Sequence, residues 1–181
     1  MAEDVVALLM RQHGDIRNLF DEVEKTSGEA RTEAFRRLVH LLAVHETAEE
    51  EVLHPMARTA HPGAEKVIEQ RLAEEKGAKE ILSRLEDMDT DDPKFLPELL
   101  RLRTEVMHHA RAEERYEFPH VRRTSGAAQL ATMAKALRAA EATAPTHPHP
   151  GVETGTRNAL LGPVAAIVDR TRDAVRKVMG R

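Results

Sequence analysis

Apolar residues recur at intervals of three and four along most of the chain, a spacing that lines them up on one face of an α-helix. Four segments show this pattern and are expected to be helices: residues 4–25, 31–59, 64–88 and 94–118. Turn-forming residues separate them, as at Ser27-Gly28 and at Pro62-Gly63. Because short connections place neighbouring helices antiparallel, the sequence predicts an all-α fold, an up-down-up-down four-helix bundle.

The pattern changes after the fourth segment. Residues 126–142 are rich in alanine and predict a fifth helix, the proline-studded stretch 144–151 predicts a stiff linker, and an apolar stripe within 157–179 predicts a last helix. We therefore expect a bundle domain over residues 1–122 and a C-terminal helical extension over residues 123–181. The extension is expected to pack on the bundle or on a partner subunit.

The composition argues against some classes of binding partner and limits which atoms could bind a metal. The net charge is −4 and no basic stripe stands out, which argues against a nucleic-acid partner. No apolar run approaches the ~20 residues of a bilayer-spanning helix, and the N-terminal residues lack the features of a signal peptide. We therefore expect a cytoplasmic protein without membrane association. Because the chain has no cysteine, any metal must be bound by nitrogen and oxygen atoms.

One motif occurs twice in the chain, with every matched position 64 residues apart. His45 and Glu49 in the second predicted helix, and His109 and Glu113 in the fourth, both belong to the pattern H-x-x-x-E-E-x-x-x-x-P. The four-residue spacing places each His and Glu on one helix face, and at about 100° per residue that face is the apolar one. A single pair of this kind is usually a surface hydrogen bond, whereas two pairs on apolar stripes are typical of a bundle that holds metal between its helices.

Polar residues also interrupt the apolar faces of the other two helices. Four apolar residues follow His13 at offsets of 3, 6, 7 and 10, and Glu75 has apolar residues at the same four offsets in the third helix. The candidate metal ligands are then three imidazoles and three carboxylates: His13, His45, Glu49, Glu75, His109 and Glu113. Unpaired charges in a bundle core are costly, and six ligands exceed the four of a tetrahedral zinc site. The set fits two metals bridged by carboxylates, with iron or manganese favoured.

A ferritin-like di-metal site is the alternative interpretation, because such proteins use Glu-x-x-His motifs. The chain contains Glu51-Val-Leu-His54 and Glu105-Val-Met-His108. Counted at about 100° per residue, Glu51 and His54 point away from the face of His45, and the two copies miss the 64-residue offset. We therefore interpret these motifs as coincidental, and expect His54 and His108 at the surface or outside the ligand set.

His13, together with the two H-x-x-x-E-E motifs and their downstream Pro55 and Pro119, resembles the hemerythrin-like, or HHE cation-binding, family. The resemblance covers roughly residues 4–120 and implies a four-helix bundle with a non-haem di-iron centre. In that family Glu49 and Glu113 would bridge or nearly bridge the irons, together with an oxo or hydroxo group. Manganese or zinc is less expected than iron.

The chain departs from the family on the third helix, where the family usually presents a histidine and this chain has Glu75. A carboxylate in that place makes the site harder and more anionic, which should favour ferric iron. Reversible oxygen carriage is then less expected than chemistry on oxygen or peroxide.

Two further residues are candidates beside the six. Tyr116, the chain's only tyrosine, is expected one turn beyond Glu113 on the apolar stripe, where it would donate a hydrogen bond to a bridging carboxylate or ligate ferric iron. The resemblance also points to Glu46, because in some members of the family the residue after the helix-two histidine is a ligand. By helical angle Glu46 lies to one side of the face of His45. Glu50 and Glu114 are expected to be solvated or to support the ligands.

Three functional hypotheses follow. The first is a di-iron protein that binds or reacts with O2, H2O2 or NO, with catalase-like peroxide breakdown as its enzymatic form. The second is an iron- and oxygen-sensing module without turnover, in which loss of the cluster loosens the bundle. The third is a structural helical protein with adventitious zinc. A monomer and a homodimer are both compatible with the sequence.

Overall fold

The computed structural model describes residues 4–57, 64–143 and 161–180. Two of its α-helices continue through a five-residue π-helical turn into a further short α-helix. The elements in chain order are α1 (Val5–Lys25), α2 (Gly28–Ala48), η1 (Glu49–Leu53), α3 (His54–Ala57), α4 (Ala64–Glu86), α5 (Phe95–Ala112), η2 (Glu113–Glu117), α6 (Phe118–Thr124), α7 (Ala127–Thr143) and α8 (Leu161–Met179). Within these ranges there is no β-strand, so the predicted all-α class is confirmed.

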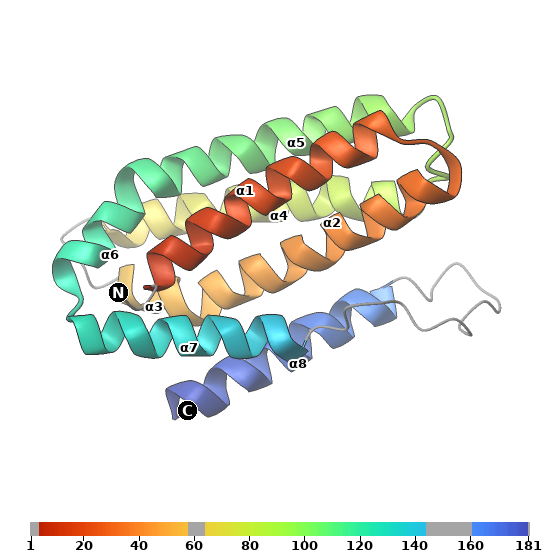
Figure 1. The fold of residues 1–181 in the computed structure, drawn as a ribbon. Coiled ribbons are helices and arrows are strands. Elements are labelled where there is room, and N and C mark those ends of the chain that lie inside the picture. The colour runs from red at the N-terminus through yellow and green to blue at the C-terminus, as the bar shows by residue number, and fades with distance from the viewer. Residues whose placement is uncertain (1–3, 58–63, 144–160, 181) are drawn as a thin grey trace.

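The four long helices α1, α2, α4 and α5 form the predicted bundle, and α7 and α8 lie together along one side of it (Figure 1). Helix α1 packs against α2 and α5, and α4 packs against α5. Helix α7 contacts α1 and α2, and α8 contacts α2 and η1. The extension therefore packs on the bundle of its own chain. The proline-rich stretch 144–151 lies outside the described residues.

Local sequence explains where the helices begin and end. Asp4 caps α1, because its Oδ1 accepts a hydrogen bond from the backbone N–H of Ala7 at 2.8 Å. Gly28 follows the end of α1 with φ of +57°, a backbone conformation that disfavours residues with a Cβ atom. The predicted break at Ser27-Gly28 is therefore confirmed.

The bundle interior contains two apolar clusters, with a polar layer between them. One lies toward the α1–α2 connection and includes Ile16 and Leu42, and the other includes Leu9 and Phe118 and is completed by α7 and α8. On α1, His13 sits between Leu9 and Ile16, so it lies at the boundary of the two clusters. Burial in these clusters stabilises the fold by roughly 25 cal/mol per Å² of apolar surface, and the same clusters exclude water from the polar layer.

The two π-helical turns occupy equivalent places in α2 and α5. The backbone N–H of His54 donates to the carbonyl of Glu49, and that of Phe118 donates to the carbonyl of Glu113, so each turn takes in one residue more than an α-helical turn. Pro55 and Pro119 follow directly, and proline cannot donate the backbone hydrogen bond that a regular helix needs. Each proline is thus preceded by a wide turn of the helix.

No helix in the parts of the chain that the structure describes is both long and apolar enough to cross a membrane.

Glu86 lies outside the polar layer, and its raised pKa predicts how the stability of the fold depends on pH. It is half-buried at the C-terminal end of α4, and burial followed by the charge of Asp87 raises its pKa to about 7 from 4.5. Because the folded state holds this proton more tightly, the ionised carboxylate destabilises the fold increasingly from pH 4.5 to 7 and fully above pH 7. E86Q should therefore raise the unfolding free energy by about 1 kcal/mol at pH 8, allowing for partial exposure, and by almost nothing at pH 4. Denaturant titrations at the two pH values would measure this difference, and an equal effect at both would contradict it.

Candidate metal centre

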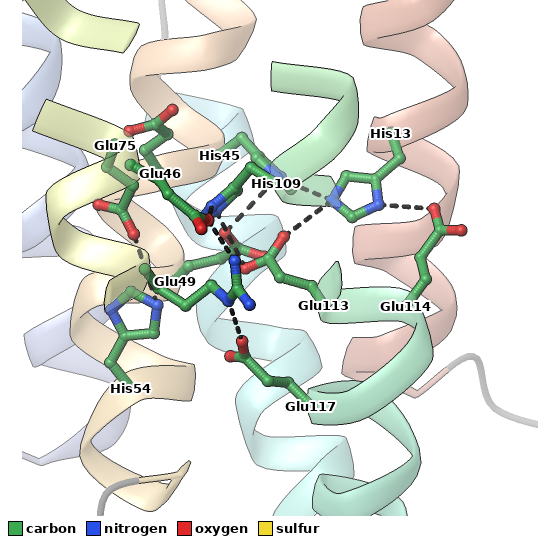
Figure 2. A network of polar contacts seen from close by, with 12 residues as sticks. His13, His45, Glu46, Glu49, His54, Glu75, His109, Glu113, Glu114 and Glu117 are labelled. Atoms are coloured by element: carbon green, nitrogen blue, oxygen red, sulfur yellow. Dashed lines mark hydrogen bonds and ion pairs between the residues drawn. The ribbon is translucent and has the colours of Figure 1, made fainter. Parts of the chain in front are cut away.

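Four of the six predicted ligands converge at the centre of the bundle. His13 from α1, His45 from α2, Glu49 from η1 and Glu113 from η2 each offer one ligand atom, and these atoms all lie within 4.8 Å of one another. All four side chains are buried. They face one another from different helices in Figure 2. The helical register read from the sequence therefore placed these residues on the correct faces.

The distances between these atoms suit a shared metal ion. The Nε2 atom of His13 lies 3.1 Å from Nε2 of His45 and 3.4 Å from Oε2 of Glu113. The Nε2 atom of His45 lies 3.6 Å from Oε2 of Glu49. Ligand atoms that bind a metal at about 2.1 Å and at right angles are themselves about 3 Å apart. The cluster therefore has the dimensions of a metal site.

A second group of ligand atoms adjoins the first. His54, Glu113 and Glu117 also place one ligand atom each within 4.8 Å of one another, and all three side chains are buried. Glu113 belongs to both groups, so it could contribute to holding two neighbouring ions. A carboxylate shared in this way is typical of two-metal sites in helical bundles.

His54 is buried, so the surface position given as one alternative for it is wrong, whereas a supporting role stays a prediction; Glu117 was not among the predicted residues. The burial of His54 follows from the extra residue in its π-helical turn. In an α-helix the residue five positions after Glu49 points away from it, but in η1 the i→i+5 bond brings His54 back to the same face. In η2, Glu117 is also buried, four residues after Glu113. The prolines six residues after Glu49 and Glu113 were the available signal for a locally altered helix.

The predicted position of Tyr116 on the apolar stripe is also wrong. Its side chain is 60% exposed, and the guanidinium of Arg115 lies 5.4 Å from the centre of its ring. Tyr116 stands three residues after Glu113, which is the same face in an α-helix but not in the wider turn η2. In this position Tyr116 is outside the buried cluster.

The remaining predicted ligands, Glu75 and His109, are buried beside the two groups. Glu75 is 2% exposed, and its Oε1 lies 3.6 Å from Nε2 of His54. The Nε2 atom of His109 lies 3.3 Å from Oε1 of Glu113. The register that assigned Glu75 to the bundle interior is therefore correct, while metal binding by either residue stays a prediction. Glu46 is also buried and lies outside both groups.

Each of three histidines has its Nδ1 atom held by an acceptor while Nε2 faces the cluster. The Nδ1 atom of His13 lies 2.8 Å from Oε1 of Glu114. The Nδ1 atom of His45 lies 2.8 Å from Oε1 of Gln12, and that of His109 lies 3.3 Å from Oε2 of Glu74. An acceptor at Nδ1 keeps the proton on that nitrogen and leaves the lone pair of Nε2 directed inward. This arrangement is typical of metal-binding histidines, and Glu114 has the supporting place expected of it.

Burial and charge shift the pKa values of the cluster in opposite directions. Burial, together with the nearby charge of Glu113, raises the pKa of Glu49 well above its ordinary value. Burial opposes ionisation of Glu113, but the imidazoles of His109 and His13, whose Nε2 atoms lie 3.3 and 3.4 Å from its oxygens, outweigh it and hold the Glu113 pKa far below the usual range. Burial lowers the pKa of His45 to about 3, so this imidazole is neutral and able to bind metal.

The buried carboxylates fit a bound cation. Both oxygens of Glu49, of Glu75 and of Glu113 are inaccessible to water and have no partner with the geometry of a hydrogen bond. Such groups are rare in folded proteins, because an unsatisfied buried carboxylate costs several kcal/mol. Metal ions would neutralise them, and a nitrogen and oxygen donor set without sulfur suits iron or manganese. The residues present therefore fit a metal centre.

Comparisons with known proteins agree with this geometry. The family model described as Hemerythrin HHE cation binding domain matches residues 4–121. An uncharacterized hemerythrin-like protein of Schizosaccharomyces pombe is 25% identical over 138 residues, which cover 75% of this chain and 68% of that protein. A DNA nickase of Nostoc sp. is 26% identical over 140 residues, which cover 77% of this chain but only 38% of the nickase.

A solved structure has the same fold. The crystal structure of a hemerythrin HHE cation binding domain-containing protein from Mycobacterium kansasii matches with a TM-score of 0.66 and 19% identity. The match covers 97% of this chain and 96% of the other. At this level of identity the likeness shows the fold alone.

Proposed function

This chain belongs to the hemerythrin HHE cation-binding domain family, and from that membership we propose that its buried cluster binds two iron ions and that the loaded protein binds or reacts with O2 or peroxide. One observation supports this proposal most strongly. Three imidazoles from three helices present Nε2 to a buried cluster of carboxylates, and each imidazole is held by an acceptor at Nδ1. A purely structural core would have no need of that arrangement.

The two overlapping groups of ligand atoms would supply the two ion positions. One ion would be held by His13, His45 and Glu49, and the other by His54 and Glu117. Glu113 would belong to both positions, because it is the residue that the two groups share. His109 and Glu75 stand beside Glu113 and His54 and would complete the second position.

Iron bound there would accept and return the electrons that pass between the two peroxide molecules, or would supply them to O2. The protein supplies orientation and the exclusion of water. Glu114, Gln12 and Glu74 fix the imidazole rings, and the two apolar clusters close the polar layer above and below. A small ligand such as O2, H2O2 or NO is the proposed partner, because the side chains of the candidate ligands are buried in the bundle.

Peroxide consumption tests the enzymatic form of the proposal. Protein purified after iron-replete expression should contain about two irons per chain and show an absorbance band in the near ultraviolet. Added H2O2 should be consumed with release of O2, in the catalase-like ratio of one O2 for two H2O2. Iron measured by plasma emission and O2 measured by electrode are the readouts. Di-iron protein that neither consumes peroxide nor changes its spectrum would contradict this form.

A metal-dependent sensing module without turnover is the second candidate, and two contacts with the C-terminal helices favour it. The Nε2 atom of Gln12, which holds His45, donates to Oε1 of Glu141 on α7 at 2.9 Å. Glu51 in η1 accepts hydrogen bonds from Arg172 and Arg176 on α8 at 3.0 and 3.1 Å. Large metal-dependent changes in α7 and α8 without peroxide consumption would favour sensing. Zinc alone after iron-replete expression would instead favour the structural protein with adventitious metal.

A further inference from the structure

A lysine on α4 closes the side of the cluster that faces α2. The ammonium of Lys79 lies 2.8 Å from Oε1 of Glu50, 3.5 Å from Oε2 of Glu46 and 3.6 Å from Oε2 of Glu75. The exposed fraction of these side chains falls from 30% for Glu50 to 12% for Glu46 and 1% for Glu75. The three carboxylates therefore form a graded line from solvent to the interior, with one cation at its outer part.

The inner end of this line reaches the candidate metal ligands. Glu75 turns its Oε2 toward Lys79 and its Oε1 toward Nε2 of His54, which lies 3.6 Å away. Figure 2 shows Glu46 and Glu75 beside each other on the side of the cluster away from His13, with His54 below them. Both oxygens of Glu75, and Oε2 of Glu46, are buried and have no hydrogen-bond partner. Buried carboxyl oxygens without a hydrogen-bond partner indicate that this row of residues can bind a cation.

The side chain of Lys79 can be displaced by an incoming cation more easily than that of Arg71, a second cation near the cluster. Arg71 is buried and bonds both Glu117, at 2.9 Å, and Glu74, so it is fixed on both sides. The Lys79 side chain is 52% exposed and carries its charge on a flexible four-carbon stem, which can swing into solvent. Three carboxyl groups also face this one ammonium, so a divalent cation in its place would find several oxygen ligands.

We propose that Glu50, Glu46 and Glu75 are the uptake path for the metal, and that an incoming divalent cation displaces the Lys79 ammonium and passes along them to His54. The inference rests on the proposed function only in requiring that the cluster binds metal. It assigns to Lys79 the role of a tethered cation that holds the path closed while no metal is entering. It also assigns a separate role to Glu50, which is too far toward the surface to belong to either ligand group.

The rate of metal uptake tests this path. Metal-free full-length protein is mixed with Co²⁺ in a stopped-flow instrument, and binding is followed by the visible absorbance of the bound ion. E50Q should load about tenfold more slowly than the unchanged chain, because the outermost carboxylate is lost. K79M should load faster, because no ammonium competes for the carboxylates. Both variants should reach the same final cobalt content.

E80Q is the matched control. Glu80 is exposed, lies next to Lys79 on α4, and undergoes the same change of charge. E80Q should load at the rate of the unchanged chain, and raised salt should slow the unchanged chain more than E50Q. Equal rates for E50Q and E80Q, or slower loading of K79M, would overturn the uptake path while leaving metal binding intact. Failure of every protein to bind cobalt or iron would instead overturn the proposed function.

Discussion

E113A should lower the metal content of the protein from about two ions per chain to nearly none. Glu113 is fully buried and is the residue that the two groups of ligand atoms share, so its loss affects both positions at once. Its oxygens also lie 3.3 and 3.4 Å from Nε2 of His109 and of His13, and they orient both rings. Loss of a residue that only supports a ligand typically costs 10–100-fold in metal affinity, so loss of a shared ligand should cost more than roughly 100-fold.

The experiment compares E113A with E113Q and E105Q after iron-replete expression. E113Q keeps the volume of the side chain but removes its charge, so it separates packing from metal binding. Glu105 is exposed on the same helix, α5, and E105Q should keep full metal content. Circular dichroism of the metal-free proteins establishes that each variant folds. An E113A protein that folds and still holds two irons with an unchanged spectrum would contradict the assignment of Glu113 as the shared ligand.

The fold could be predicted largely from the sequence because helix periodicity is a local property. Apolar residues at a period of 3.6 fixed the faces of the four long helices, and polar interruptions at His13 and Glu75 could be assigned to the interior by the same count. Glycine and proline marked the breaks. Each of these inferences needs only the regular geometry of one helix, and each holds where the helix is regular.

The count failed where the geometry stopped being regular. A constant angle per residue cannot be carried across η1 and η2, so it misplaced His54 and Tyr116. The supporting contacts were beyond reach for a different reason. That Gln12 holds His45, or that Arg71 holds Glu117, depends on how two helices are rotated relative to each other. No periodicity within either helix contains that information.

Removal of the metal should lower the melting temperature of the protein by about 10 °C or more. Without metal, the buried oxygens of Glu49, Glu75 and Glu113 have no hydrogen-bond partner, and the layer that they occupy separates the two apolar clusters. A ligand present at 1,000 times its dissociation constant stabilises the folded state by about 4 kcal/mol. For a chain of this size each kcal/mol shifts the melting temperature by about 2–4 °C, so one ion accounts for roughly 8–16 °C.

Calorimetry of the iron-loaded protein, the chelated protein and the chelated protein after iron is restored measures this shift. Restored iron should recover the original melting temperature, which separates metal loss from damage by the chelator. H45A is the matched control, because it removes a candidate ligand. Burial lowers the pKa of His45 to about 3, so its imidazole is neutral, and the contact with Gln12 orients it toward the cluster. In H45A, iron should change the melting temperature much less. Equal melting temperatures for loaded and chelated protein would mean that the buried carboxylates are stable without a cation, and the physical basis of the metal centre would be lost.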